Sequence, residues 1–423
     1  MKLVKDEKFH DKGYHNFEGN LDQPRHRWYP FKEGFSAELV EEALASKEQG
    51  RPLRVLDPFG GSGTTAVTAA MSGHEAHSIE VNPFCAFTSR VKCTGGAWRK
   101  KSFDRVCQQV HKKALRYRSK SPLENLSTFS EQSGRPKWLF NSSVLRAFHA
   151  VSRAVDDTPS TYSDALRLAS IRAAMECCNA KKDGKALRYR KGWESRGFCA
   201  DDFREHFERF SSQVFEDISL APIEKSNCVR TDTGDARAKL SSLRSNSFDQ
   251  LVTSPPYLNS FDYSDVYRPE LFLGGFVGSN NELREIRLKT LRSHIQVKWG
   301  GSIEVESPLL AQPLERLKAS PNLWNQRIPQ MVSAYFHDMR KIMVEGFRVL
   351  RPESEAWFVV STSAYAGVEI PVDLILAELG CSVGFELNGV YALRSLRAAG
   401  QQQSKFSAKG FPLRESLIIL NKR

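Results

Sequence analysis

The chain has 423 residues and carries 61 Lys and Arg against 49 Asp and Glu, which gives a formal net charge of +12 at pH 7. Its hydrophobic content of 40% is ordinary for a globular protein and excludes bulk disorder. The polar start and the short apolar runs predict neither a secretory signal nor a membrane span, so a cytoplasmic protein is expected.

Eight Cys are scattered through the sequence, without a C-x-x-C pair and without a His at zinc-finger spacing. We therefore expect free thiols in a reducing compartment and no bound metal. The excess of positive charge favours a polyanionic partner, but it indicates nucleic acid only together with other signals.

The first 25 residues are polar and glycine-containing, which predicts an irregular arm. An aromatic and basic stretch follows at 26–35. Ser36 then stands as the N-cap of an amphipathic helix predicted over 37–46, and Gly50 and Pro52 end that helix.

A short apolar strand at 53–57 ends in Asp57, and the glycine-rich turn 58–65 leads into a helix of small residues. The next strand, 76–80, ends in Glu80. This order of strand, loop, helix and strand is typical of domains that bind dinucleotides or nucleosides.

The chemistry of this turn suits a charged, nucleoside-like ligand. Its glycines allow the backbone to turn sharply and to approach a ligand, and the free N–H groups at the start of the helix favour an anion. Asp57 can pair with a cation beside that anion, and Glu80 lies where this fold meets ribose hydroxyls. A phosphate-binding Walker A loop is excluded because no Lys-Ser/Thr pair follows the last glycine. A tight strand–helix connection without a ligand is the alternative.

Residues 97–225 form a largely helical, basic segment in which arginines and lysines alternate with aromatic residues. The cluster at 188–193 is the best candidate for contact with phosphates and unstacked bases, and its members are Arg188, Tyr189, Arg190 and Lys191. Gly192 is expected to break a helix beside this cluster. A solvated basic helix face is the competing interpretation.

The sequence Thr-Ser-Pro-Pro-Tyr at 253–257 directly follows a predicted strand at 248–252. Two prolines at a strand end stop sheet pairing and leave the local carbonyls as hydrogen-bond acceptors. Ser254 adds a hydroxyl acceptor and Tyr257 adds a flat ring, a combination that suits the exocyclic amine of a nucleobase. A rigid turn without chemistry is the alternative. A second basic segment, 258–330, separates this loop from a predicted amphipathic helix at 333–352, a strand at 356–362, a helix near 371–379 and a last strand at 416–422.

Together, the sequences LDPFGGSGTT at 56–65 and TSPPY at 253–257 resemble the cofactor loop and the catalytic loop of the amino-group DNA methyltransferases. Members of this family transfer a methyl group from S-adenosylmethionine to N4 of cytosine or N6 of adenine. The resemblance covers roughly 26–96 and 228–423. It implies a Rossmann-like class I methyltransferase sheet with helices on both faces, interrupted by two largely helical, basic insertions.

The resemblance also implies roles for individual residues. Phe35 is expected to contact the methionine part of the cofactor, Glu80 its ribose, and Asp235 its adenine amino group. The full set of expected cofactor contacts is Phe35, Asp57, Pro58, Phe59, Gly60, Gly61, Gly63, Thr64, Thr65, Glu80, Asn82 and Asp235. The expected catalytic residues are Ser254, Pro255, Pro256 and Tyr257.

The order of the two motifs, cofactor loop before catalytic loop, excludes the permuted arrangement of this family. The chain is then divided into an arm (1–25), a cofactor-binding part (26–96), a first insertion (97–225), a catalytic part (226–257), a second insertion (258–330) and a C-terminal part (331–423). Both insertions are candidates for reading the DNA sequence, because the longer one precedes the TGDA segment at 233–236 instead of following it.

Within the family, the form S-P-P-Y is associated mainly with N4-cytosine methylation, so we expect cytosine in duplex DNA as the target. N6-adenine methylation, N-methylation of RNA, and a DNA-binding specificity subunit without turnover are the alternatives. The target base has to leave the duplex because its amine is buried in pairing. Neither a metal nor a cysteine nucleophile is required. We also expect the protein to act in a bacterial or archaeal cell and to associate with the nucleoid through DNA. A cognate restriction endonuclease is a further candidate partner.

Overall fold

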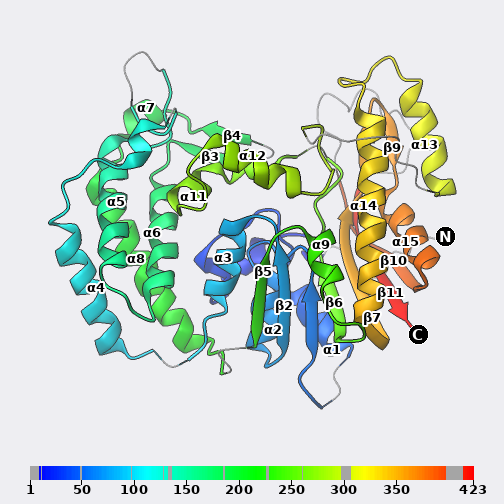
Figure 1. Cartoon of the computed structure of the whole chain (residues 1–423), viewed down its shortest axis with the longest axis horizontal. Coiled ribbons are helices and arrows are strands. Elements are labelled where there is room, and N and C mark those ends of the chain that lie inside the picture. The colour runs from blue at the N-terminus through cyan, green and yellow to red at the C-terminus, as the bar shows by residue number, and fades with distance from the viewer. Residues whose placement is uncertain are drawn as a thin grey trace.

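The computed structural model describes residues 9–10, 12–47, 50–96, 98–126, 128–131, 136–183, 186–224, 228–259, 261–296, 306–396 and 413–423. Within these residues, a seven-stranded sheet forms the centre of the molecule (Figure 1). Its strands in spatial order are β10 (Glu386–Ser395), β11 (Arg414–Lys422), β7 (Leu350–Ser361), β6 (Phe248–Thr253), β1 (Arg54–Asp57), β2 (Glu75–Glu80) and β5 (Val229–Thr233). Strand β11 runs antiparallel to both of its neighbours, and the other neighbouring strands pair in parallel. The expected Rossmann-like α/β fold is confirmed.

Helices cover both faces of this sheet because its central strands are apolar on both sides. Residues of β7 alternate between the two cores: Trp357 and Val359 face one, and Phe358 and Val360 face the other. The first core is covered by α1 (Ala37–Ala45) and α2 (Thr64–Met71). The second is covered by α9 (Ala236–Ser241), α14 (Ile328–Val349) and α15 (Val372–Val383). Ser36 caps α1 as expected, accepting a hydrogen bond from the N–H of Leu39 at 3.2 Å.

The first insertion is a helical layer beside the β5 edge of the sheet (Figure 1). Its helices are α4 (Lys100–Ala114), α5 (Ser142–Asp156), α6 (Ser163–Glu176), the short α7 (Trp193–Arg196) and α8 (Ala200–Leu220), with a 3-10 turn η3 at Pro122–Asn125. It packs through one shared apolar core against α3 (Pro83–Lys92), the helix that follows β2.

The basic cluster at 188–191 does not lie on a helix, which corrects the expectation for this stretch. Residues 186–189 form β4 (Ala186–Tyr189), paired antiparallel with β3 (Ala180–Asp183). Along β4 the side chains of Ala186 and Arg188 are exposed, whereas those of Leu187 and Tyr189 are partly buried. This period of two is the pattern of a half-buried strand. Gly192 then begins a new short helix, α7, instead of ending one.

The second insertion crosses the top of the molecule in Figure 1. Helices α10 (Tyr263–Val266), α11 (Arg268–Leu273) and α12 (Asn280–Lys289) lie beside the first insertion and above the sheet. Helix α13 (Pro308–Lys318) packs instead with α14 and with the two-stranded ribbon of β8 (Ser363–Tyr365) and β9 (Val368–Ile370).

The N-terminal arm contains the 3-10 turn η1 (Glu18–Leu21), and the 3-10 turn η2 (His26–Trp28) directly follows it. Arg25 ties the end of the arm to the rest of the chain. This residue is fully buried, and its guanidinium donates hydrogen bonds to the carbonyls of Lys92, Thr94 and Ala221. Trp28 adds a hydrogen bond from its ring N–H to Asp217 of α8 at 2.9 Å. None of the helices described is both long and apolar enough to cross a membrane.

Candidate active site

A cavity of about 470 Å³ lies at the carboxyl ends of the central strands, and both sequence motifs contribute to its wall. This is the edge at which open parallel sheets place their ligands. The expected site residues that line the cavity are Pro58, Phe59, Gly61, Glu80, Asn82, Asp235, Ser254, Pro255, Pro256 and Tyr257. Two loops that lie almost 200 positions apart in the chain therefore face one space.

The glycine-rich turn lies flat against β2 and α3. A Cβ atom on Gly60 would lie 1.7 Å from the Ser78 hydroxyl, and one on Gly63 would lie 2.9 Å from the Ser89 Cα atom. Gly63 also has φ of 93°, the left-handed conformation that only glycine adopts without strain. Gly60, Gly63, Thr64 and Thr65 support the turn from behind and are not part of the cavity wall.

Glu80 and Asn82 form the wall at the end of β2. The Glu80 carboxylate accepts hydrogen bonds from the N–H groups of Gly61 and Asn82, both at 2.8 Å, and burial raises its pKa to about 7. The side-chain oxygen of Asn82 caps α3 through the N–H of Phe84. Its buried amide nitrogen has no hydrogen-bond partner in the described chain. This face of the cavity therefore offers a carboxylate acceptor, and the Asn82 amide nitrogen is buried behind it.

Asp57 lies behind the wall and not in it. Its carboxylate accepts hydrogen bonds from the Thr253 hydroxyl at 2.6 Å and from the N–H of Phe59 at 3.0 Å. Burial raises the pKa of Asp57 to about 6. The residue thereby joins the start of the glycine-rich turn to the start of the loop 253–257.

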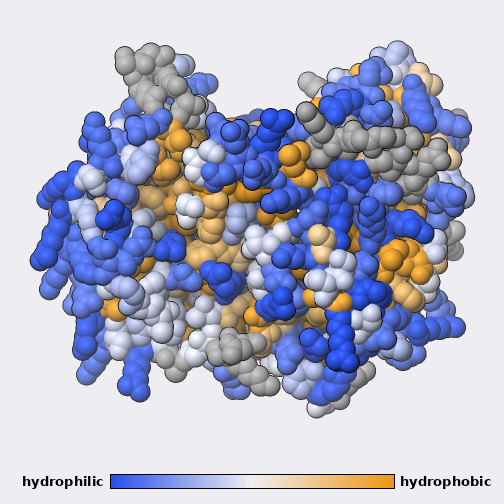
Figure 2. Space-filling model, viewed as in Figure 1, coloured by the Kyte–Doolittle hydropathy of each residue, from blue (hydrophilic) through white to orange (hydrophobic). Residues whose placement is uncertain are grey.

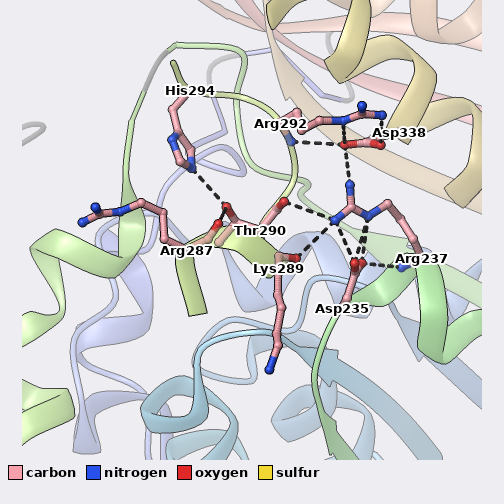
Figure 3. Close-up of polar contacts among 8 residues, drawn as sticks. All are labelled: Asp235, Arg237, Arg287, Lys289, Thr290, Arg292, His294 and Asp338. Carbon is pink, nitrogen blue, oxygen red and sulfur yellow. Dashed lines mark hydrogen bonds and ion pairs between the residues drawn. The ribbon is translucent and has the colours of Figure 1, made fainter. Parts of the chain in front are cut away.

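Asp235 caps α9 at the end of β5 and lies in a network of charges that Figure 3 shows. Arg237 binds Asp235 at 2.7 Å and also Asp338 of α14 at 2.7 Å. Arg292 of the second insertion binds the other oxygen of Asp338 at 2.6 Å. The network fixes Asp235 and holds the segment 289–294, which closes this side of the cavity.

His294 belongs to the same segment and is almost completely buried in the wall. One ring nitrogen lies 3.0 Å from the Thr290 hydroxyl and the other 3.0 Å from the side-chain oxygen of Gln296. Burial lowers the pKa of His294, which keeps the ring neutral near pH 7.

The loop 253–257 lines the cavity with Ser254 and Tyr257. The Ser254 hydroxyl donates a hydrogen bond to the carbonyl of Val359 at 3.1 Å, which leaves its oxygen lone pairs as acceptors. Burial and the nearby Glu415 raise the pKa of Tyr257 well above its ordinary value, so the phenol stays protonated. Arg394, at the end of β10, lines the cavity beside this loop.

Phe35 does not line the cavity but packs in the core beneath α1, with 4% of its surface exposed. The aromatic residue at the wall is Phe31, four positions earlier, which stacks on Tyr267 of the second insertion at 5.5 Å between ring centroids. The Tyr267 hydroxyl donates a hydrogen bond to Glu33 at 2.6 Å.

The four expected DNA-binding residues lie outside the cavity wall. Arg188 is exposed and forms a long ion pair with Asp183 at 3.5 Å, and Lys191 is also exposed. Tyr189 packs against Trp193, and Arg190 donates a hydrogen bond to the carbonyl of Cys178 at 2.9 Å. Two of the four are thus surface cations and two support the hairpin.

Phe31, Tyr267, Arg394 and the segment 289–294 were not predicted from the sequence as site residues. Phe31 and the expected Phe35 lie in the same aromatic stretch at 26–35. The stretch was therefore predicted, but the residue within it was not. No sequence motif marks Arg394 as a site residue. It reaches the cavity because β10 pairs with β11 at the far edge of the sheet.

Neither a metal-binding group nor a disulfide is found among the described residues. No three His, Cys, Asp or Glu side chains there are placed to hold a metal ion, and the eight Cys residues are free thiols.

The chain matches known methyltransferases in sequence, although no family model matches it. It is 26% identical to the type II methyltransferase M.AvaI of a Nostoc species over 92% of this chain and 84% of that protein. It is also 26% identical to the type II methyltransferase M.BsoBI of Geobacillus stearothermophilus, over 96% and 87% respectively. Among solved structures, a SAM-dependent methyltransferase of Agrobacterium tumefaciens aligns over 93% of this chain and 66% of that one at 12% identity, with a TM-score of 0.29. Over nearly its whole length, the chain is similar to bacterial type II methyltransferases.

Proposed function

We propose that this protein transfers a methyl group from S-adenosylmethionine to the N4 amine of a cytosine flipped out of duplex DNA. The observation that carries the proposal is the shared cavity, in which Glu80 and Asp235 face the same space as Ser254 and Tyr257. Similarity to type II methyltransferases over more than nine-tenths of the chain supports the reaction class, and the charge of +12 supports a DNA substrate.

The residues at the β1, β2 and β5 ends fit the cofactor. Glu80 would accept hydrogen bonds from the ribose hydroxyls, and Asp235 would accept one from the adenine amino group. Asn82 lines the same part of the cavity wall. The cofactor, when bound, contributes a methyl group on a positively charged sulfur.

The catalytic loop would then orient the target amine. Tyr257 stacks on the extruded base, and the Ser254 oxygen with the Pro255 carbonyl accepts hydrogen bonds from the amine. Held in this way, the amine nitrogen would point its lone pair at the methyl group that the bound cofactor would supply. After the transfer, the amine loses one proton to solvent. Positioning and electrostatics supply most of the rate in such a transfer.

The proposal is tested by product analysis. The protein is incubated with S-adenosylmethionine and either unmethylated phage λ DNA or tRNA, and the nucleosides are identified by mass spectrometry. We expect N4-methyldeoxycytidine from the DNA only. In single-turnover assays, Ser254→Ala should lower the rate about ten- to hundredfold because the amine is no longer aligned, whereas cofactor affinity should stay unchanged.

The control is Ser382→Ala, which alters an exposed Ser at the end of α15, away from the cavity. N6-methyladenine as the product would contradict the choice of cytosine, methylated tRNA would contradict the choice of DNA, and no product at all would contradict the proposed activity.

A further inference from the structure

The strand order places different residues on the two sides of the loop that follows β6. Glu80 and Asp235 follow β2 and β5, on one side of the catalytic loop that follows β6. Strands β7, β11 and β10 lie on the opposite side of β6. Because β11 is antiparallel to both neighbours, β10 runs parallel to β6 and its last residues reach the same edge of the sheet. Arg394 therefore lines the cavity across the catalytic loop from the cofactor residues, where the target base has to enter.

One end of the Arg394 side chain is fixed by Glu415 at the start of β11. The two residues are cross-strand partners, and the Arg394 Nε donates to a Glu415 carboxylate oxygen at 2.7 Å. The Glu415 side chain is 7% exposed and that of Arg394 is 38% exposed. The two terminal amino groups of the guanidinium have no hydrogen-bond acceptor among the residues that the structure describes. They form a fixed pair of parallel donors at the cavity.

Glu415 also connects Arg394 to the catalytic loop. Burial, together with the charge of the nearby Glu415 carboxylate, raises the pKa of Tyr257 and keeps its hydroxyl protonated. Glu415 therefore holds the Arg394 guanidinium and also lies near Tyr257, and both of these residues line the cavity. A ring that stacks on a base and a fork of donors at the edge of that base have to lie close together in this way.

We propose that Arg394 is a specificity-determining residue that binds the pairing edge of cytosine through its N3 and O2 atoms, while Ser254 accepts from the N4 amine. This inference rests on the proposed function. Cytosine carries two adjacent acceptors beside its amine, which a guanidinium can bind with two parallel hydrogen bonds. Adenine carries the single acceptor N1 beside its amine, followed by a C–H group. Adenine would therefore leave one of the two donors facing a C–H group once the base covers them, which disfavours it relative to cytosine.

The test compares Arg394→Met and Arg394→Lys with the parent in single-turnover methylation of phage λ DNA. We expect Arg394→Met to form N4-methyldeoxycytidine at least tenfold more slowly, with cofactor affinity unchanged in calorimetry. Arg394→Lys should recover only part of the rate, because an ammonium group lacks the planar fork. The matched control is Arg340→Met, which removes an exposed arginine of α14.

A second variant guards against loss of folding. Arg394→Met leaves Glu415 buried without its partner, which destabilises proteins. The double variant Arg394→Met/Glu415→Gln removes both charges, and it should fold and still show the slow rate.

The outcomes separate the two proposals. If Arg394→Met or the double variant methylates cytosine as fast as the parent protein, the role of Arg394 is overturned while the proposed methyltransferase activity stays intact. In a third outcome, the variant recovers the parent's rate at low salt, and the logarithmic salt slope of its DNA binding falls by the amount expected for about one lost phosphate contact. That result would assign Arg394 to the DNA backbone and would also overturn its role in specificity. A parent that forms only N6-methyladenine would overturn the cytosine assignment before any variant is made.

Discussion

Glu80 is a residue at which ligand binding and stability conflict. Its carboxylate is held at the cavity wall by two backbone N–H groups, yet burial raises its pKa from 4.5 to about 7. The folded protein therefore retains this proton more strongly than the unfolded chain does. As the pH rises from 4.5 to 7, the unfolded chain ionises first and the protein without cofactor loses stability, by at most about 3 kcal/mol.

Glu80→Gln should therefore stabilise the protein and weaken its ligand binding. The gain in free energy of unfolding should be small at pH 5 and largest at pH 8, because only at high pH does the parent bury a charge at this position. Affinity for S-adenosylmethionine should fall about tenfold or more, since the ribose would no longer donate its hydrogen bonds to a charged acceptor. Urea unfolding at both pH values and calorimetry check the two effects. An equal change in stability at pH 5 and pH 8 would contradict the role assigned to the buried charge.

Three elements far apart in the sequence meet in the charge network of Figure 3. Asp235 precedes α9, Asp338 lies in the middle of α14, and Arg292 follows α12 in the second insertion. The two carboxylates and the guanidinium groups of Arg237 and Arg292 balance in charge. The Asp338 side chain is 1% exposed, and the two arginines hold the pKa of its carboxyl low despite its burial. The network therefore joins the adenine side of the cavity to the insertion that covers it.

Asp338→Asn should destabilise the protein and weaken cofactor binding, although Asp338 does not itself line the cavity. It leaves two guanidinium groups, 19% and 16% exposed, with one carboxylate. Breaking a fully buried pair costs about 3–5 kcal/mol, so a smaller loss is expected here. The double variant Asp338→Asn/Arg292→Met restores the charge balance and should recover much of the melting temperature. Thermal unfolding and calorimetry with S-adenosylmethionine measure both effects, with Asp265→Asn on the exposed face of α10 as control. Unchanged cofactor affinity in Asp338→Asn would show that Asp235 needs no support from α14.

At the scale of elements, the sequence predicted strands β1, β2, β6, β7 and β11 and the two loops, because these depend on local patterns, but it did not predict β10. An apolar run that ends in Asp57 or in Ser-Pro-Pro-Tyr is visible without tertiary contacts. The sequence could not show that Phe31, and not the expected Phe35, lines the cavity. Both lie in one aromatic stretch, and only packing beneath α1 decides which side chain enters the core. The β3–β4 hairpin was not predictable either, because its strands are four residues long and lie in a basic segment that is otherwise helical.

The molecule as a whole presents basic residues on surfaces that differ in their distance from the cavity. Helix α4, with Lys101 and Arg105 exposed, lies at the outer edge of the first insertion, where hydrophilic residues dominate the surface (Figures 1 and 2). The β3–β4 hairpin lies beside the cavity instead. Lys182 of this hairpin is 3.3 Å from the centre of the Tyr267 ring, and Tyr267 lines the cavity.

A flipped base can reach Ser254 only if the duplex lies over the cavity mouth, so the hairpin and not α4 should contact the DNA backbone. Replacing both Arg188 and Lys191 by Gln should weaken DNA binding and reduce its logarithmic salt slope by about 0.9 for each phosphate that is no longer neutralised. Arg190 is left unchanged because it supports the hairpin through the Cys178 carbonyl. The matched control, Lys101→Gln/Arg105→Gln, removes the same charge from α4 and should leave the slope unchanged. Fluorescence anisotropy with a labelled duplex at several salt concentrations measures both. A slope that falls for the α4 variant but not for the hairpin variant would mean that the DNA crosses the outer face of the first insertion.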